Sequence, residues 1–252
     1  MYEETRAVAV PGAVLWRAEG GGGVVLPDGC MDLLWADGRL LVAGPDTRPH
    51  PAGEVPGGLV AGIRLAPGTA PALLGVPAHV LRDRRAPLAD LWSPRQARLL
   101  AGRVARHGDP RAGLEELAAR LAAEAGPPDP LAAEVTARLR AGATVADLAR
   151  ATGLGPRRLH RRSLDAFGYG PRTLGRVLRL RRALALARSG TPYAEVAWAA
   201  GYADQSHLAR EVRALAGTTL SAYTAGPAPA GDSAPAGAKR ETPQPSGSST
   251  TA

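Results

Sequence analysis

Two similar stretches, TVADLARATGLGPRRLHRR (residues 144–162) and TPYAEVAWAAGYADQSHLARE (residues 191–211), decide the fold of the C-terminal part of this chain. In each, an Ala precedes a Gly by four positions, and an apolar Leu follows the Gly by six or seven. The positions are Ala149, Gly153 and Leu159 in the first copy and Ala197, Gly201 and Leu208 in the second. The two stretches therefore repeat one pattern.

Each position of the pattern has its own physical role. A small Ala lets one helix lie close across another. A Gly adopts a positive φ and turns the chain within two or three residues. The Leu anchors the second helix to the core and leaves its opposite face outward. The pattern predicts a helix-turn-helix, whose second helix is suited to enter a major groove. One match has little specificity in an Ala-rich chain, whereas two matches joined by a helical connector have much more.

The distribution of charge supports a polyanionic partner for the same part of the chain. The whole protein of 252 residues carries a net charge of +8. Residues 131–223 hold fifteen Arg and six acidic residues, while residues 1–130 hold fourteen Arg and fifteen acidic residues. A nearly neutral part joined to a strongly basic one predicts that only the second binds a polyanion such as duplex DNA. A solvated basic helix face is the alternative that charge alone leaves open.

Residues 131–223 resemble the DNA-binding domain of AraC/XylS-type transcription regulators. The resemblance is carried by ADLARATGL, LHRR, FGYGP and LRLRRALALA, and above all by EVAWAAGYADQSHLARE. It implies two helix-turn-helix units joined by a long helix, in a bacterial regulator. Three positions depart from the family pattern, because Ser163, Leu208 and Val212 stand where the family usually has aromatic anchors.

The sequence of the N-terminal half predicts a β-rich domain. Strands are expected within residues 6–18, 24–26, 31–36, 39–43 and 58–65, with a hairpin turn at Asp37-Gly38. The stretches LPDGCMDLLWADGRLLVAGPDT and LLGVPAHVLRDRRAPLADLW resemble the sensor-type domain of an AraC-like subgroup, which implies a cupin-like fold. The predicted fold class is therefore α+β with two domains: a β-rich barrel or sandwich with flanking helices, and an all-α double helix-turn-helix.

The helices that follow the strands define the predicted domain organisation. Residues 94–107 and 111–125 have the apolar spacing of amphipathic helices, with Ser93-Pro94 as a fitting start. This helix pair either packs on the β-rich part or forms a homodimer. We expect an N-terminal sensor or dimerisation domain at 1–126, a Pro-rich linker at 127–130, the DNA-binding domain at 131–225 and a disordered tail at 226–252.

The outward face of each second helix supplies the expected DNA contacts, by resemblance to the family positions that reach DNA. The candidates for base contacts are Arg157, His160 and Arg161 in the first unit and Gln205, Ser206, His207 and Arg210 in the second. Arg pairs with guanine and Gln with adenine through two hydrogen bonds, while Ser adapts to either. Candidates for phosphate contacts are Arg158, Arg172, Arg176 and Arg179. Asp204 is expected to cap a helix.

Other chemistry finds little support in the sequence. The single cysteine, Cys30, has acidic neighbours, so a small buried side chain is favoured over a redox or alkyl-accepting thiol. His50 and His79 have no ligand cluster around them, and no hydrolytic triad or phosphate loop is recognisable. We therefore expect no enzymatic activity, cofactor or metal. The start of the chain lacks a signal peptide pattern, so a cytoplasmic protein without a membrane span is expected.

The sequence thus predicts a sequence-specific DNA-binding regulator whose N-terminal domain binds a small-molecule effector. Two alternatives stay open. One is an enzyme-like regulator that uses Cys30 as an alkyl acceptor or redox sensor. The other is a ligand-free DNA-binding protein whose N-terminal domain only mediates assembly.

Overall fold

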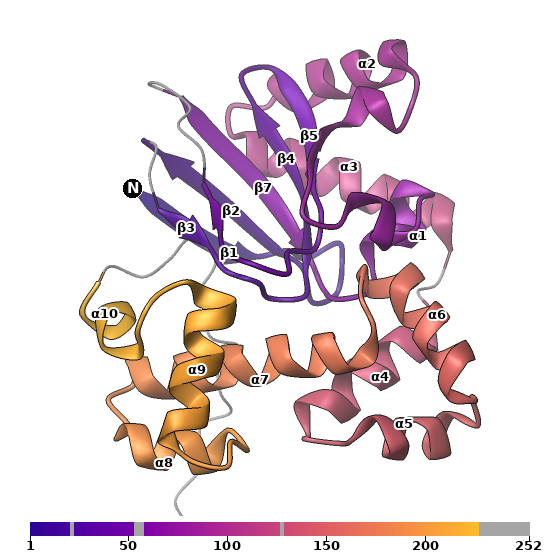
Figure 1. Cartoon of the computed structure of the whole chain (residues 1–252). Coiled ribbons are helices and arrows are strands. Elements are labelled where there is room, and N and C mark those ends of the chain that lie inside the picture. The colour runs from indigo at the N-terminus through magenta and orange to yellow at the C-terminus, as the bar shows by residue number, and fades with distance from the viewer. Residues whose placement is uncertain (21–22, 53–57, 127–128, 227–252) are drawn as a thin grey trace, which may run out of the picture.

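The structure is a computed structural model that describes residues 1–20, 23–52, 58–126 and 129–226. Its N-terminal part is rich in strands and its C-terminal part is helical (Figure 1). This division confirms the α+β class predicted from the sequence.

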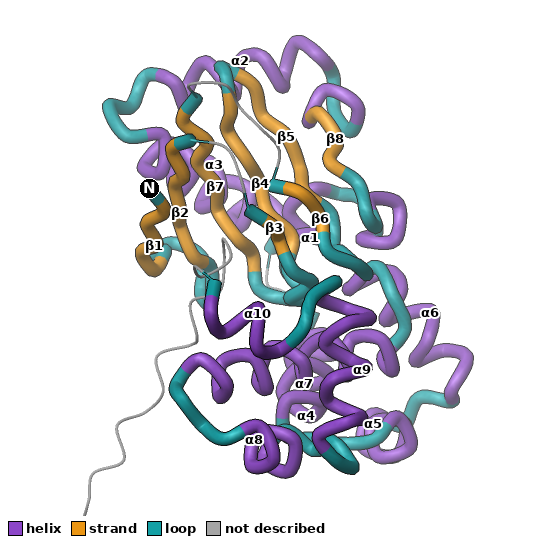
Figure 2. The backbone as a smooth tube through the Cα atoms, turned by 60° about the vertical axis from the view of Figure 1, so that its left-hand side comes forward, coloured by secondary structure: helices purple, strands orange, loops and turns teal. Residues whose placement is uncertain are grey.

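The main sheet of the N-terminal part is antiparallel and has six strands. In spatial order they are β1 (Tyr2–Arg6), β2 (Val14–Glu19), β7 (Leu59–Leu65), β4 (Met31–Ala36), β5 (Arg39–Ala43) and β8 (Arg85–Pro87). Strands β4 and β5 form the predicted hairpin, and both turn residues, Asp37 and Gly38, have positive φ. Two short strands, β3 (Val24–Val25) and β6 (His50–Pro51), pair separately. Figure 2 shows this pair in front of the main sheet.

The two faces of the main sheet differ in what they contact. Successive side chains of a strand point to opposite faces. One face carries buried apolar side chains such as Leu15, Leu33 and Ile63, and it packs in one core with three helices. These are α1 (Ala70–Leu74), α2 (Pro94–Ala105) and α3 (Pro110–Ala125). The other face carries half-buried polar residues, among them Asp32 and Arg64.

Helix α2 begins as the sequence predicts, and α3 begins one residue earlier than predicted, at Pro110. The Ser93 hydroxyl accepts a hydrogen bond from the Gln96 amide at 3.2 Å, and Pro94 opens α2. The buried residues of both helices, including Leu100 and Leu114, belong to the sheet's core. Their buried faces are therefore occupied by packing within the chain.

The C-terminal part contains seven described helices arranged around a long central one. They are α4 (Pro130–Arg140), α5 (Val145–Thr152), α6 (Pro156–Phe167), α7 (Pro171–Arg188), α8 (Tyr193–Ala199), α9 (Gln205–Ala216) and α10 (Leu220–Ala225). Figure 1 shows α7 passing between α4–α6 at one end and α8–α10 at the other. Two apolar cores lie along α7: Leu174 belongs to the first and Leu180 and Leu184 to the second.

Helix α4 begins inside the predicted linker, at Pro130, and most of the predicted tail lies outside the described residues. Residues 127–128 and 227–252 lie outside the described residues. Asp129 and Pro130, expected in the linker, instead start α4, where the Asp129 carboxylate accepts a hydrogen bond from the Leu131 amide at 3.0 Å. A proline suits the first position of a helix because its missing N–H would have no partner there.

Candidate nucleic-acid interface

The first helix-turn-helix unit consists of α5, a tight turn and α6. The Thr144 hydroxyl and the Asp147 carboxylate cap the start of α5 by hydrogen bonding to each other's backbone amides. The turn passes through Gly153 at φ +66°, the conformation that the sequence pattern predicts. Leu148 and Leu159 are fully buried, and they hold the two helices in one core.

The exposed side of α6 is strongly basic. Leu159 points into the core, and the residues around it are exposed: Arg157, Arg158, His160, Arg161 and Arg162. Arg162 pairs with Asp129 at 2.7 Å, which ties α6 to the start of α4. The structure thus brings Arg157, His160 and Arg161, the predicted base contacts, onto one helix with their side chains exposed.

The second unit, α8–turn–α9, repeats this design with a different cap. Gly201 turns the chain at φ +79°, and Leu208 is fully buried. The Asp204 carboxylate accepts a hydrogen bond from the His207 amide at 2.6 Å, which confirms its predicted role as the cap of α9. Gln205, Ser206 and Arg210 are exposed on α9.

His207, also predicted to contact bases, has partners within the protein. Its ring meets the Tyr202 ring edge-on, with 5.3 Å between the ring centroids. Its Nδ1 atom accepts a hydrogen bond from the Ala203 amide at 3.4 Å. These contacts hold the turn before α9 and leave the residue only half-exposed.

The three arginines of α7 that were predicted to contact phosphates lie in different surroundings. Arg172 is exposed. Arg176 donates two hydrogen bonds to Glu211 of α9, at 2.9 and 3.0 Å, and these bonds lower the pKa of Glu211. The Arg179 guanidinium lies 4.7 Å from the centroid of the Tyr202 ring. Arg176 and Arg179 thus fix the second unit on α7, a role that residue type alone does not reveal.

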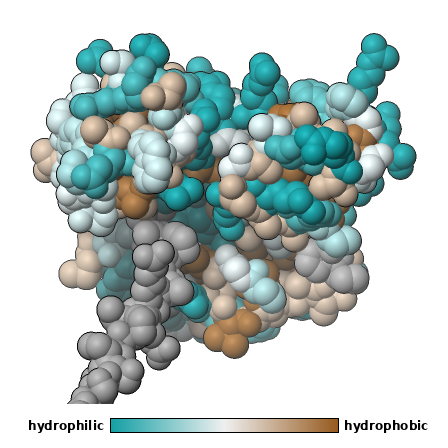
Figure 3. Space-filling view, turned by 90° about the horizontal axis from the view of Figure 1, so that it is seen from below, coloured by the Kyte–Doolittle hydropathy of each residue, from teal (hydrophilic) through white to brown (hydrophobic). Residues whose placement is uncertain are grey.

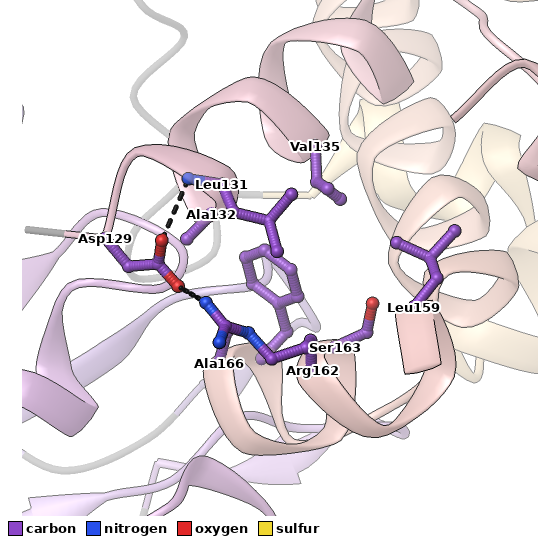
Figure 4. A pocket seen from close by; sticks show the side chains of 9 residues that line it. Asp129, Leu131, Ala132, Val135, Leu159, Arg162, Ser163 and Ala166 are labelled. Atoms are coloured by element: carbon purple, nitrogen blue, oxygen red, sulfur yellow. Dashed lines mark hydrogen bonds and ion pairs between the residues drawn. The ribbon is translucent and has the colours of Figure 1, made fainter. Parts of the chain in front are cut away.

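Three positions at which the resembled regulators usually have aromatic residues are buried in this chain: Ser163, Leu208 and Val212. Ser163 is buried, and its hydroxyl has no hydrogen-bond partner among the described residues. It lines a small pocket between α4 and α6, together with Ala132, Val135 and Phe167 (Figure 4). The space open to water there is about 10 Å³, which is room for one water molecule at most.

Replacing Ser163 by Ala is expected to stabilise the protein by about 1 kcal/mol, because a buried hydroxyl without a partner costs its desolvation free energy. Urea unfolding of the two proteins measures this difference. Ser189→Ala is the matched control, since the exposed Ser189 hydroxyl donates to the Leu186 carbonyl at 2.8 Å. If the free energy of unfolding were lower for Ser163→Ala than for the parent chain, the Ser163 hydroxyl would not be a buried group without a partner.

Cys30 lies beside three charged residues, Asp28, Asp32 and Arg64, which form ion pairs on the polar face of the main sheet. The Asp28 carboxylate accepts a hydrogen bond from the Cys30 amide at 2.8 Å. Burial, together with the nearby Asp28 carboxylate, raises the pKa of the Cys30 thiol well above its usual range. This environment suppresses the thiolate, which is the form that attacks electrophiles and oxidants.

Asp32, in the same group, makes stability depend on pH. Its carboxylate accepts a hydrogen bond from the Trp16 indole at 2.7 Å, and burial raises its pKa from 3.8 to about 6. The folded state therefore binds this proton more tightly than the unfolded state, so stability falls as pH rises from about 4 to above 6.

The Asp32→Asn variant is expected to lack this pH dependence. Relative to the parent chain, its free energy of unfolding should rise by on the order of 2 kcal/mol between pH 4 and pH 7. Urea unfolding at both pH values gives the comparison. If the free energies of unfolding of the two proteins differed by the same amount at pH 4 and pH 7, the raised pKa assigned to Asp32 would be contradicted.

Among the residues that the structure describes, no group of three or more His, Cys, Asp or Glu side chains is arranged to hold a metal ion. No described helix has both the length and the apolar character needed to cross a membrane.

Seen from below, the molecule presents a largely hydrophilic surface with scattered apolar side chains (Figure 3). Trp198 of α8 is the most exposed of the described aromatic residues, with 83% of its surface accessible. Exposed arginines of α6, α7 and α9 give the helical part its basic character.

Comparison with known proteins supports the division into two parts. Residues 148–226 match a family model described as a helix-turn-helix domain, and residues 14–87 match a domain of unknown function. No curated protein gives a significant match. The first match spans most of both helix-turn-helix units.

Among solved structures, the chain is similar to ToxT from Vibrio cholerae. An apo variant of ToxT has a TM-score of 0.49 and 9% identity, covering 88% of this chain and 98% of that chain. A complex of ToxT with (E)-4-(8-methylnaphthalen-1-yl)but-3-enoic acid has a TM-score of 0.46 and 10% identity, with coverage of 88% and 98%. ToxT bound to an unsaturated fatty acid has a TM-score of 0.45 and 11% identity, with coverage of 84% and 94%.

Proposed function

We propose that this chain, an AraC/XylS-type DNA-binding transcription regulator, recognises a specific duplex sequence by placing α6 and α9 in successive segments of the major groove. The observation that carries this proposal is the presence of two helix-turn-helix units fixed on one helix, α7, each with an exposed polar second helix. Successive major-groove segments on one side of DNA lie about 34 Å apart. We take residues 131–225 as the DNA-binding domain and residues 1–126 as the regulatory domain.

Base recognition is assigned to the exposed residues near the start of each second helix. Arg157, His160 and Arg161 serve in α6, and Gln205, Ser206 and Arg210 serve in α9. The side chains of Arg161 and Gln205 have the geometry for paired hydrogen bonds to guanine and adenine, respectively. His207 is the remaining candidate, and its contacts with Tyr202 and Ala203 favour a supporting role.

Phosphate contact is assigned to Arg158 and Arg172, which are exposed. The Arg172→Ala variant is expected to bind all sequences more weakly, with a slope of log K against log salt shallower by about 1. Arg176→Ala should instead lower the stability of the second unit, because it removes the guanidinium that pairs with the Glu211 carboxylate. Fluorescence anisotropy across a salt series separates the two effects. An unchanged salt slope for Arg172→Ala would contradict its assignment.

The proposed function is tested by incubating the purified protein with fragments of its source genome and sequencing the recovered DNA. Enrichment of one or a few sites is expected, and that enrichment should be lost in Arg161→Ala and Gln205→Ala. Uniform, salt-sensitive recovery of all fragments, unchanged by added metabolites, would overturn the proposal of sequence specificity.

For the N-terminal part we propose control by a small-molecule effector, in a protein that acts on chromosomal DNA in the cytoplasm. A homodimer is a further proposal, which sedimentation analysis tests. The suppressed thiolate of Cys30 disfavours the alkyl-acceptor alternative. Intact-mass analysis after treatment with an alkylating agent tests that alternative, since an adduct on Cys30 would support it.

A further inference from the structure

The two helix-turn-helix units are joined to each other through α7. Among the described residues, the extensive packing of α4–α6 and of α8–α10 runs within each unit or onto α7, and not from one unit to the other. The apolar cores of the two units are likewise separate. A helix of 18 residues can bend along its length. A second connection between the units is therefore needed to fix the separation of α6 and α9.

The loop between β5 and β6, residues 44–49, contacts the C-terminal ends of both α6 and α9. Gly168 ends α6 at φ +80°, and Gly217 ends α9 at φ +66°. A Cβ atom placed at Gly168 would overlap Pro45, and one placed at Gly217 would lie 3.1 Å from Pro49. Two prolines of one short loop thus lie against the ends of two helices that belong to different units. We name residues 44–49 the β5–β6 loop.

The β5–β6 loop is held in place by hydrogen bonds to the segment that leads into β8. The Thr47 amide and hydroxyl both donate to the Asp83 carboxylate, at 2.7 and 2.8 Å. The Asp46 carboxylate accepts two hydrogen bonds from Arg85, at 2.7 and 2.9 Å. Asp83 itself has φ +57°, which is costly for a residue other than glycine, and its amide donates to the Pro45 carbonyl at 3.1 Å. These bonds make the loop a stiff spacer.

Further contacts attach each unit to the N-terminal part. Arg82 donates a hydrogen bond to the Gly168 carbonyl at 3.3 Å, and His79 lies 3.4 Å from Asp165 of α6. Leu26 is 5% exposed and belongs to the core of the second unit. Figure 1 shows the strand-rich part lying along α7, next to both units. The N-terminal part is therefore the second connection between the units.

We propose that the β5–β6 loop holds α6 and α9 at a fixed separation and thereby determines which spacing of two operator blocks the protein binds. The inference rests on the proposed function, in which each of the two helices reads one block. One added base pair moves a block by about 3.4 Å along the duplex and rotates it by about 35°. Helices held at a fixed separation reject such a shift, whereas helices joined by α7 alone would follow it in part.

The separation of α6 and α9 is measured without DNA, by pulsed electron paramagnetic resonance on the full chain. Spin labels are attached at Arg158→Cys in α6 and Ala209→Cys in α9, two exposed positions, in a Cys30→Ala background. We expect a narrow distribution of distances between the labels in the chain that has the native β5–β6 loop.

Two substitutions weaken the loop without changing either helix-turn-helix unit. Asp83→Gly removes the carboxylate that binds Thr47, while glycine accepts the positive φ. Pro49→Gly removes the ring that contacts Gly217 and frees the backbone of the loop. Each is expected to broaden the distribution of label distances about twofold or more. Urea unfolding shows whether each variant is folded, and either variant alone suffices for the test.

Matched controls make the same changes of residue type away from the two helices. Asp37→Gly replaces an exposed aspartate at φ +48°, in the turn at the other end of β5. Pro51→Gly replaces an exposed proline of β6 that pairs with Val24. Neither control should broaden the distribution. Unchanged distributions in the folded loop variants, or equal broadening in the controls, would overturn the inference.

A second measurement tests the consequence for DNA binding. With one base pair added or removed between the two blocks of the selected operator, the parent chain is expected to lose about tenfold or more in affinity, and the loop variants about threefold or less. A dependence on spacing that matches the parent chain in the loop variants would overturn the inference. A chain that selects no operator would instead overturn the proposed function. The label distances are measured without DNA, so the two failures are distinguishable.

Discussion

Arg161→Ala and Gln205→Ala are each expected to weaken binding to the selected operator by about 1–3 kcal/mol, which is roughly 5- to 150-fold in Kd. Under the proposed base contacts, each replacement removes a pair of hydrogen bonds to one base edge. The fold should be retained, because both side chains are exposed on their helices. The loss should be much smaller on a scrambled duplex, since non-specific binding depends on phosphate contacts.

Two variants of α2 are controls for the loss of a positive charge and of a side-chain amide, because α2 lies away from the proposed DNA interface. Arg95→Ala removes the same charge as Arg161→Ala, and Gln96→Ala removes the same amide as Gln205→Ala, from exposed positions. Operator affinity in these controls should stay within about twofold of the parent chain. Equal losses in the controls and in the α6 and α9 variants would contradict the assigned base contacts.

Leu208→Ala is expected to lower the free energy of unfolding by about 2–5 kcal/mol and to abolish operator binding. Leu208 is fully buried in the second core, beneath α9, so its removal leaves a cavity that the neighbouring side chains fill only in part. Urea unfolding and fluorescence anisotropy on the same samples measure both consequences.

Leu99→Ala on α2 is the matched control, because Leu99 is 60% exposed. Its free energy of unfolding should stay within about 0.5 kcal/mol of the parent chain. If Leu208→Ala kept both its stability and its affinity, Leu208 would not be the anchor of the second helix.

The helix-turn-helix units were predictable from sequence because every decisive feature is local. Gly153 and Gly201 turn the chain within a few residues, and Leu159 and Leu208 follow at helical spacing. Asp204 was recognisable as a cap from its place before the helix. The hairpin at Asp37-Gly38 belongs to the same class of short-range signal.

Features that depend on distant partners were not predictable. Strand β8 has only three residues, and a 3₁₀ turn lies on each side of it in the sequence. It forms a strand because it pairs with β5. The first strand, β1, begins at Tyr2, ahead of the expected range, because it pairs with β2 along its whole length. No local feature of the sequence distinguishes the exposed Arg172 from Arg176. The difference arises because Arg176 of α7 pairs with Glu211 of another helix, α9. The insertion of Leu26 into a core of the C-terminal part is likewise a contact between residues far apart in sequence.

The most direct test of two-helix recognition is selection of binding sites from a random duplex library by the parent chain, Arg161→Ala and Gln205→Ala. Recognition by both helices predicts a motif of two blocks about one helical turn apart, with Arg161→Ala relaxing base preference in one block and Gln205→Ala in the other. A single block, or a loss of preference in the same block for both variants, would contradict recognition by both helices.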